Sequence, residues 1–172
     1  MKSGDIILLT RRKLSINPRS WLTYLISILS GKYVHTALIF ADPMTKILKV
    51  REMDSKGVVL SDYSTYLQQL KQRITIITPV LQLSQTELND YNYICRYDNS
   101  KYDFINLLFL QVLKIFLHRF VGRDTKLKRT CSEDTARIYN FIRKNTFENP
   151  KGITPNEVFY NNNFEIVSRE TY

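Results

Sequence analysis

Cysteine, histidine, tryptophan, glycine and proline are all scarce in this chain of 172 residues, which contains two Cys, two His, one Trp, five Gly and five Pro. Two cysteines are too few for a disulfide-stapled scaffold, and 44% of the residues are hydrophobic. We therefore expect residues 1–172 to form one globular domain that buries about two thirds of its unfolded surface. Cys95 and Cys131 are expected to be free thiols in helices, with a disulfide between them as the alternative.

Long hydrophobic runs are also lacking. The run Ile6–Leu9 is the only apolar one before Arg11 and Arg12, and it is too short for the core of a signal peptide. The most apolar stretch, Phe104–Val121, is interrupted by charged and amide side chains, which is typical of a core helix and not of a membrane span. The expected location is the cytoplasm.

Positive charge exceeds negative charge, with 25 Lys and Arg against 16 Asp and Glu, a formal net charge of +9. Five basic residues precede Cys131, at Arg119, Arg123, Lys126, Lys128 and Arg129. They form either a solvated loop or a surface that attracts an anionic substrate or partner, and in both cases they lower the pKa of a nearby thiol. Nucleic acid is not the expected partner, because no zinc-finger, RNA-recognition or helix-turn-helix pattern accompanies the charge. The histidine and cysteine spacing supplies no metal site, and no cofactor is expected.

Apolar, β-branched runs bounded by turn residues predict six strands. They lie at Asp5–Thr10, Val34–Phe40, Ile47–Glu52, Gly57–Leu60, Arg73–Val80 and Phe164–Ser168. Helix starts are predicted where Ser, Thr or Asn precedes a helical pattern. These starts are Asn17, Ser84, Ser100, Thr130 and Thr154. The mixture predicts an α+β fold in which an antiparallel sheet packs against helices.

The hairpin around Pro43 places two polar side chains together. If the loop runs from Asp42 to Thr45, each residue of the first strand is paired with the residue of the second strand that lies equally far from the loop. His35 then lies opposite Glu52. Directly opposed side chains have Cβ atoms about 4.5 to 5.5 Å apart, which is close enough for a carboxylate to accept a hydrogen bond from an imidazole. The apolar face of this hairpin is therefore expected to end in a His/Glu pair.

Cys131 follows Thr130, the predicted N-cap, and is the first residue of its helix. Unpaired N–H groups in a first helical turn favour negative charge, so a thiolate is stabilised there. A histidine beside it would hold the thiolate or take its proton. The structural alternatives are a core histidine and a small buried cysteine, and His118 and Cys95 are assigned to those roles.

These motifs, in this order, resemble the circularly permuted branch of the NlpC-type papain-like superfamily, the YiiX-like group, which is similar to the lecithin:retinol acyltransferase fold. The matching segments are Gly4–Leu8, Val34–Leu38, Glu52 with Gly57–Val58, Tyr102–Phe104, Cys131–Glu133 and Thr154–Glu157. As in that branch, the histidine precedes the cysteine. The resemblance implies a triad of Cys131 as nucleophile, His35 as base and acid, and Glu52 as the group that orients the imidazole.

The expected function is that of a thiol hydrolase or amidase that cleaves an amide or ester bond through a thioester, with a peptide or cell-wall peptide preferred. The N–H of Cys131 is the expected first donor to the oxyanion. One alternative is a lipid-directed acyltransferase or lipase, favoured if the apolar segments Trp21–Leu29 and Phe104–Leu117 border the cleft. The other is a catalytically silent binding or structural module that uses the basic surface.

Overall fold

The computed structural model describes residues 1–10, 31–54, 57–70, 73–102 and 128–171. Its centre is a six-stranded sheet in the order β4-β3-β2-β1-β5-β8, and every neighbouring pair is antiparallel. The strands are β1 (Ile6–Thr10), β2 (Tyr33–Ala41), β3 (Leu48–Asp54), β4 (Gly57–Asp62), β5 (Arg73–Pro79) and β8 (Phe164–Thr171). A separate parallel ladder joins β6 (Lys101–Tyr102) to β7 (Lys128–Arg129). The predicted α+β class and the six predicted strands are confirmed.

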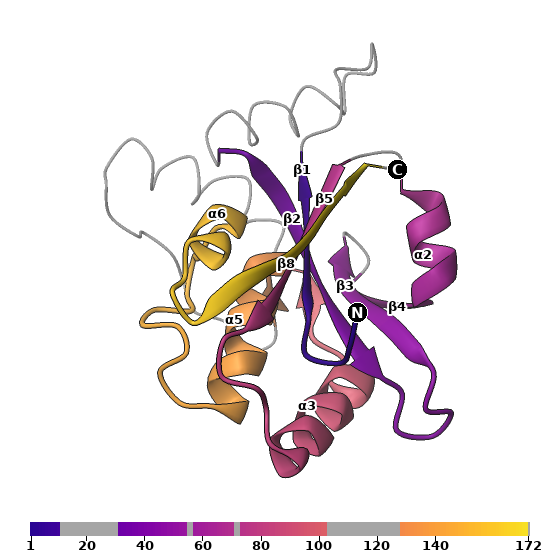
Figure 1. Cartoon of the computed structure of the whole chain (residues 1–172). Helices are drawn as coiled ribbons and strands as arrows, with labels where there is room; N and C mark the ends of the chain where they lie inside the picture. The colour runs from indigo at the N-terminus through magenta and orange to yellow at the C-terminus, as the bar shows by residue number, and fades with distance from the viewer. Residues whose placement is uncertain (11–30, 55–56, 71–72, 103–127, 172) are drawn as a thin grey trace.

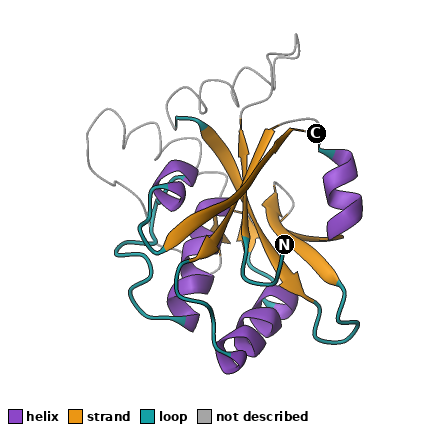
Figure 2. Cartoon of the chain, viewed as in Figure 1, coloured by secondary structure: helices purple, strands orange, loops and turns teal. Residues whose placement is uncertain are grey.

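Helices pack on both faces of this twisted sheet (Figures 1 and 2). They are α2 (Tyr63–Gln69), α3 (Gln85–Tyr97), α5 (Cys131–Ile142) and α6 (Pro155–Phe159). Alternation along β1 divides the core: Ile7 and Leu9 pack with Tyr66 of α2, whereas Ile6 and Leu8 pack with residues of α3, α5 and α6. The same division in β2 places Leu38 and Phe40 on the side of α5 and Ala37 and Ile39 on the side of α2. Tyr33, beyond a register shift in the β1–β2 pairing, packs on the α5 and α6 side.

The helix starts confirm most of the predicted caps. Ser84 and Thr154 each form a complete capping box, the second with Pro155 in the first turn. The Thr130 hydroxyl accepts a hydrogen bond from the N–H of Glu133, which makes Cys131 the first residue of α5. An N-cap of this kind stabilises a helix by about 1 kcal/mol, so the position of Cys131 is fixed by local sequence.

The predicted start at Ser100 is wrong. The Ser100 hydroxyl donates to the Asp98 carboxylate, and Lys101 and Tyr102, which would begin the predicted helix, form strand β6. Helix α2 was not predicted, although Tyr63, Tyr66, Leu67 and Leu70 have helical spacing and pack together beneath the sheet. No helix in the described part of the chain is long and apolar enough to cross a bilayer. The predicted helices at 17–30 and 104–121, with His118, lie outside the described residues.

The hairpin between β2 and β3 has a longer loop than predicted. The loop runs from Asp42 to Ile47, because the Asp42 carboxylate accepts hydrogen bonds from the N–H groups of Met44 and Thr45 and the chain then turns at Lys46 with φ 61°. Ala37, not His35, is therefore paired with Glu52. The predicted register is wrong by two residues, and since side chains alternate with period two, His35 and Glu52 still share a face.

Candidate active site

The candidate site lies where β2 and β3 separate. Their pairing ends at Ala37 and Glu52, whereas β3 continues to pair with β4 as far as Asp54. The N–H of Thr36, one residue before the last pair, is close enough to the Cys131 sulfur at the start of α5 to lower the pKa of this thiol. The thiol thus enters the sheet at the point where β2 lacks its β3 neighbour.

His35 and Glu52 approach this point from the α2 face. His35 Nε2 lies 3.2 Å from Glu52 Oε2, and the hydroxyl of Tyr66 donates to the same oxygen at 3.2 Å. The His35 side chain is 21% exposed, so solvent reaches the imidazole. With Nε2 engaged by Glu52, Nδ1 is the ring nitrogen available to the sulfur, and the imidazole is held between a carboxylate and a thiol.

The protonation states follow from this contact. Burial lowers the pKa of His35, but the charge and hydrogen bonds of Cys131 and Glu52 outweigh it and raise the pKa to about 10. Burial raises the pKa of Cys131, yet the His35 charge and hydrogen bond, with the N–H groups of Thr36 and Ser132, lower it below the usual thiol value. Both shifts favour the thiolate–imidazolium form of the pair over the neutral thiol and imidazole.

Glu52 is also ionised. Burial raises its pKa, but the hydrogen bond and charge of His35 and the hydrogen bond from Tyr66 bring the pKa below the usual glutamate value. A carboxylate at this position fixes the orientation of the imidazole and stabilises its positive charge. The structure thus brings together the three side chains that the sequence singled out, and it adds Tyr66.

Two further contacts that the sequence did not indicate support the site. The hydroxyls of Thr36 and Thr135 lie 3.0 Å apart, and Thr135 donates to the carbonyl of Cys131, which joins β2 to the first turn of α5. The amide of Asn156 in α6 bonds both the N–H and the carbonyl of Tyr33, two residues before His35. The segment Thr154–Glu157 was noted in the sequence, but nothing in it pointed to β2 as the partner of Asn156.

Comparison with known proteins adds a structural relative. Neither a family model nor a curated protein matches the sequence. Among solved structures, the crystal structure of yiiX from Escherichia coli O157:H7, described as a metalloprotein, aligns with a TM-score of 0.55. The alignment covers 99% of this chain and 98% of that one, at 16% sequence identity. The chain has a YiiX-like fold. At this identity the likeness is one of fold alone.

The basic cluster differs from the expectation where the structure describes it. Arg129 is neither solvated nor free to attract an anion, because its Nη1 lies 2.7 Å from Asp98 and 3.2 Å from Asp134. Arg119, Arg123 and Lys126 lie outside the described residues, and Lys128 is described as part of β7. For the described groups, the lowered pKa of Cys131 has His35 as its principal cause, not the basic residues.

The second cysteine has the opposite chemistry. Cys95 is fully buried in a helix, as predicted, but lies in the last turn of α3, and both cysteines are free. Burial raises the pKa of Cys95 well above the usual thiol value, so it stays protonated at neutral pH. The two thiols of the chain are therefore chemically distinct: the pKa of Cys131 is lowered, whereas that of Cys95 is raised.

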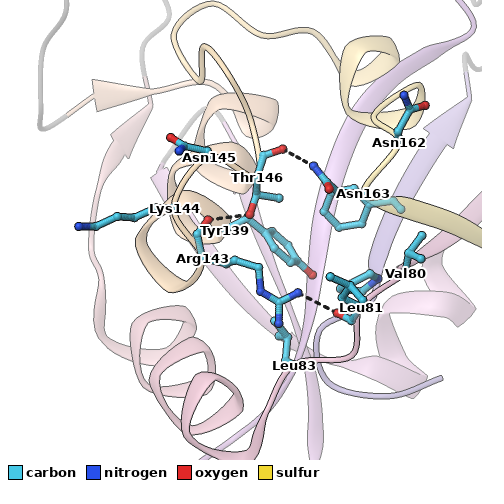
Figure 3. Close-up of a pocket in the computed structure, with 12 residues that line it drawn as sticks. Val80, Leu81, Leu83, Tyr139, Arg143, Lys144, Asn145, Thr146, Asn162 and Asn163 are labelled. Carbon is cyan, nitrogen blue, oxygen red and sulfur yellow. Dashed lines mark hydrogen bonds between the residues drawn. The ribbon is translucent and has the colours of Figure 1, made fainter.

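A cavity of about 310 Å³ lies at the far end of α5, lined by Tyr139, Arg143 and Thr146 together with loops before α3 and β8 (Figure 3). The Arg143 guanidinium is already bonded to the carbonyls of Leu81 and Gln82 and to the Glu87 carboxylate. This cavity does not include the triad. Its arginine instead attaches the last turn of α5 to the start of α3.

Replacing Tyr66 with phenylalanine is expected to raise the pKa of Glu52 by about one unit. The Tyr66 hydroxyl donates a hydrogen bond that stabilises the ionised carboxylate, and phenylalanine cannot make this bond. A carboxyl carbon NMR titration of Glu52 measures the change. Tyr93→Phe, which alters an exposed tyrosine of α3, is the control and should leave the titration unchanged. A Glu52 titration that is the same in both variants would show that the Tyr66 contact does not matter.

Proposed function

We propose that this chain is a thiol hydrolase of the amidase or peptidase type, with Cys131 as nucleophile in a permuted papain-like arrangement. The observation that carries the proposal is the double contact of His35, with the Cys131 thiol and with the Glu52 carboxylate. The order of the residues, histidine before cysteine, supports the permuted arrangement, as does the fold shared with yiiX. The proposed substrate is an amide or ester, with a peptide bond preferred.

The proposed reaction uses the ion pair described above. The Cys131 thiolate attacks the carbonyl carbon, and the electron pair of the C=O bond moves to oxygen, which the N–H of Cys131 is placed to stabilise. The imidazolium of His35 then gives its proton to the leaving amine or alcohol, and a thioester remains. His35 next removes a proton from water, which attacks the thioester, and release of the acid restores the thiolate and imidazolium. Throughout, Glu52 holds the ring.

A metal has no part in this scheme. The yiiX structure is described as that of a metalloprotein. In this chain, within the part that the structure describes, no group of three or more His, Cys, Asp or Glu side chains is arranged to hold a metal ion. His35 already contacts Glu52 and Cys131, so its ring nitrogens are engaged. The described residues therefore do not form a metal site, and the proposed reaction does not use a metal ion.

The alternative of a lipid-directed enzyme depends on two apolar segments, Trp21–Leu29 and Phe104–Leu117, that lie outside the described residues. The cysteine chemistry proposed here is the same for an amide and for a lipid ester. A test of the nucleophile therefore comes before any test of the substrate.

The test is acylation by an activated ester such as p-nitrophenyl acetate, followed by mass spectrometry after an acid quench. The parent protein is expected to carry one acetyl group on Cys131, removable by neutral hydroxylamine as a thioester is, and to turn over. Cys131→Ser is expected to lose both the adduct and turnover, whereas the matched variant Cys95→Ser keeps them. Equal acylation of Cys95 and Cys131, or unchanged turnover in Cys131→Ser, would reject the proposal in favour of a silent binding module.

A further inference from the structure

A fully buried arginine connects the sheet to the helix that carries Cys131. The side chain of Arg51, in β3, is 0% exposed, and its guanidinium forms an ion pair with Asp134 in the first turn of α5. Arg51 Nε lies 2.9 Å from Asp134 Oδ2, and Nη2 lies 3.1 Å from Oδ1. Such a two-point contact between a planar guanidinium and a carboxylate fixes direction as well as distance.

The same guanidinium also holds the end of α3. Arg51 Nη1 donates to the carbonyls of Cys95 and Asp98, at 3.2 and 2.7 Å, and Nη2 lies 3.3 Å from the Asp98 carboxylate. Arg129 completes the cluster, because its Nη1 bridges Asp98 and Asp134. Two arginines thus alternate with two aspartates. We call Arg51, Asp98, Arg129 and Asp134 the buried charge cluster.

Arg51 and Glu52 are consecutive residues of β3, so they project to opposite faces of the sheet. Glu52 orients His35 on the α2 face, and Arg51 holds the first turn of α5 on the other face. One strand therefore determines both halves of the pair, the imidazole through Glu52 and the sulfur through Arg51. At His35, β2 is still paired with Leu9 of β1 but no longer with β3, so the contact between His35 and β3 is made by the Glu52 side chain and not by strand pairing.

We infer that Arg51 and Asp134 are positioning residues that set the placement of the Cys131 sulfur against the His35 imidazole. The inference rests on the proposed function, since it concerns the same thiolate. A constellation of reacting groups has to be held within about 0.5 Å by the residues behind it, and the first turn of α5 has its charged anchor in this cluster. Neither residue touches the sulfur, so each acts through the helix.

Two variants separate positioning from simple electrostatics. Arg51→Lys keeps the positive charge but loses the two-point contact of the guanidinium with the Asp134 carboxylate. Asp134→Asn keeps the size of the side chain but removes its negative charge. If the cluster acted only through its charges, Asp134→Asn would lower the pKa of Cys131 and Arg51→Lys would leave it unchanged. If it positions the helix, both variants raise that pKa, because both weaken the contact with His35.

The measurement is the rate of Cys131 alkylation by iodoacetamide as a function of pH, with the modified residue identified by peptide mapping. Both variants are expected to react about tenfold more slowly than the parent at mildly acidic pH and to approach it at alkaline pH. Thermal unfolding, followed in parallel, confirms that the variants are folded at the assay temperature.

The matched control is Arg143→Met, which removes the ion pair with Glu87 at the opposite end of the same helix. It is expected to lower the melting temperature without changing the alkylation profile. Unchanged profiles in Arg51→Lys and Asp134→Asn, or a faster reaction in Asp134→Asn, would overturn the inference. Failure of the proposed function is distinguishable, because the parent protein itself would then show an ordinary thiol profile.

Discussion

Replacing His35 with alanine is expected to slow alkylation of Cys131 by iodoacetamide about a hundredfold at a pH about two units below the usual thiol pKa of about 8.5. At such a pH only about 1% of an ordinary thiol is ionised, whereas in the parent His35 lowers the pKa of Cys131 and keeps the thiolate populated. In the described part of the chain, His35 is the principal cation that lowers the pKa of the buried sulfur. The parent and variant rates, measured with the adduct mapped to Cys131, test this directly.

The shape of the pH profile follows from the signs of the two shifts. The Cys131 pKa is lowered, so the thiolate persists on the acid side, and the His35 pKa is raised to about 10, so the imidazolium persists on the alkaline side. Between these limits the parent rate should be flat. In His35→Ala the rate should climb through neutral pH. A parent rate that also climbs, parallel to that of the variant, would mean that no ion pair exists.

Glu52→Gln is the graded control for this experiment. It removes the charge that stabilises the imidazolium but leaves the ring next to the sulfur. The expected profile lies between those of the parent and His35→Ala. Cys95 does not add to the signal, because burial raises its pKa and it is 0% exposed.

Replacing Arg51 with methionine is expected to lower the free energy of unfolding by about 3 to 5 kcal/mol. The guanidinium is completely buried, and its loss leaves the carboxylate of Asp134, itself 4% exposed, with Arg129 as its remaining cation in the buried charge cluster. It also removes the donor to the carbonyls at the end of α3. Urea unfolding of the parent and the variant measures the difference.

Two comparisons make this result specific. Arg143→Met breaks an ion pair whose side chains are 32% and 25% exposed, and should cost only about 1 kcal/mol because solvent screens that pair. Combining Arg51→Met with Asp134→Leu should cost less than Arg51→Met alone, since the buried carboxylate is then absent as well. If Arg51→Met lowers the free energy of unfolding no more than Arg143→Met does, the buried charge cluster contributes little to stability.

Much of the site was predictable because local signals specify it. The Thr130 cap places Cys131 in the first turn of a helix, and alternation in β2 and β3 places His35 and Glu52 on one face. The hairpin register was mispredicted, because the Asp42 carboxylate builds a longer loop, yet the face was right since the error was an even number of residues. Because side chains alternate between the faces of a sheet, a register error of two residues keeps His35 and Glu52 on the same face. An error of one residue would have placed them on opposite faces.

The contacts that were not predicted join elements far apart in the chain. Tyr66 has a helical pattern that was overlooked, and this pattern alone would have suggested α2. The partners of Arg51, in contrast, come from α3 and α5, and no local pattern connects an arginine in a strand with aspartates 47 and 83 residues later. Arg129 was assigned to a basic loop for the same reason, because sequence reveals a cluster of charges but not its counterions.

The acidity of the Cys131 thiol is a property of the folded state only, since His35 comes from a strand distant in the chain. An unfolded chain carries the same cysteine with an ordinary pKa and is nearly inert to iodoacetamide under mildly acidic conditions. A brief alkylation pulse therefore counts native molecules in a mixture. During refolding, such a pulse would report at one atom whether α5 and both strands have come together.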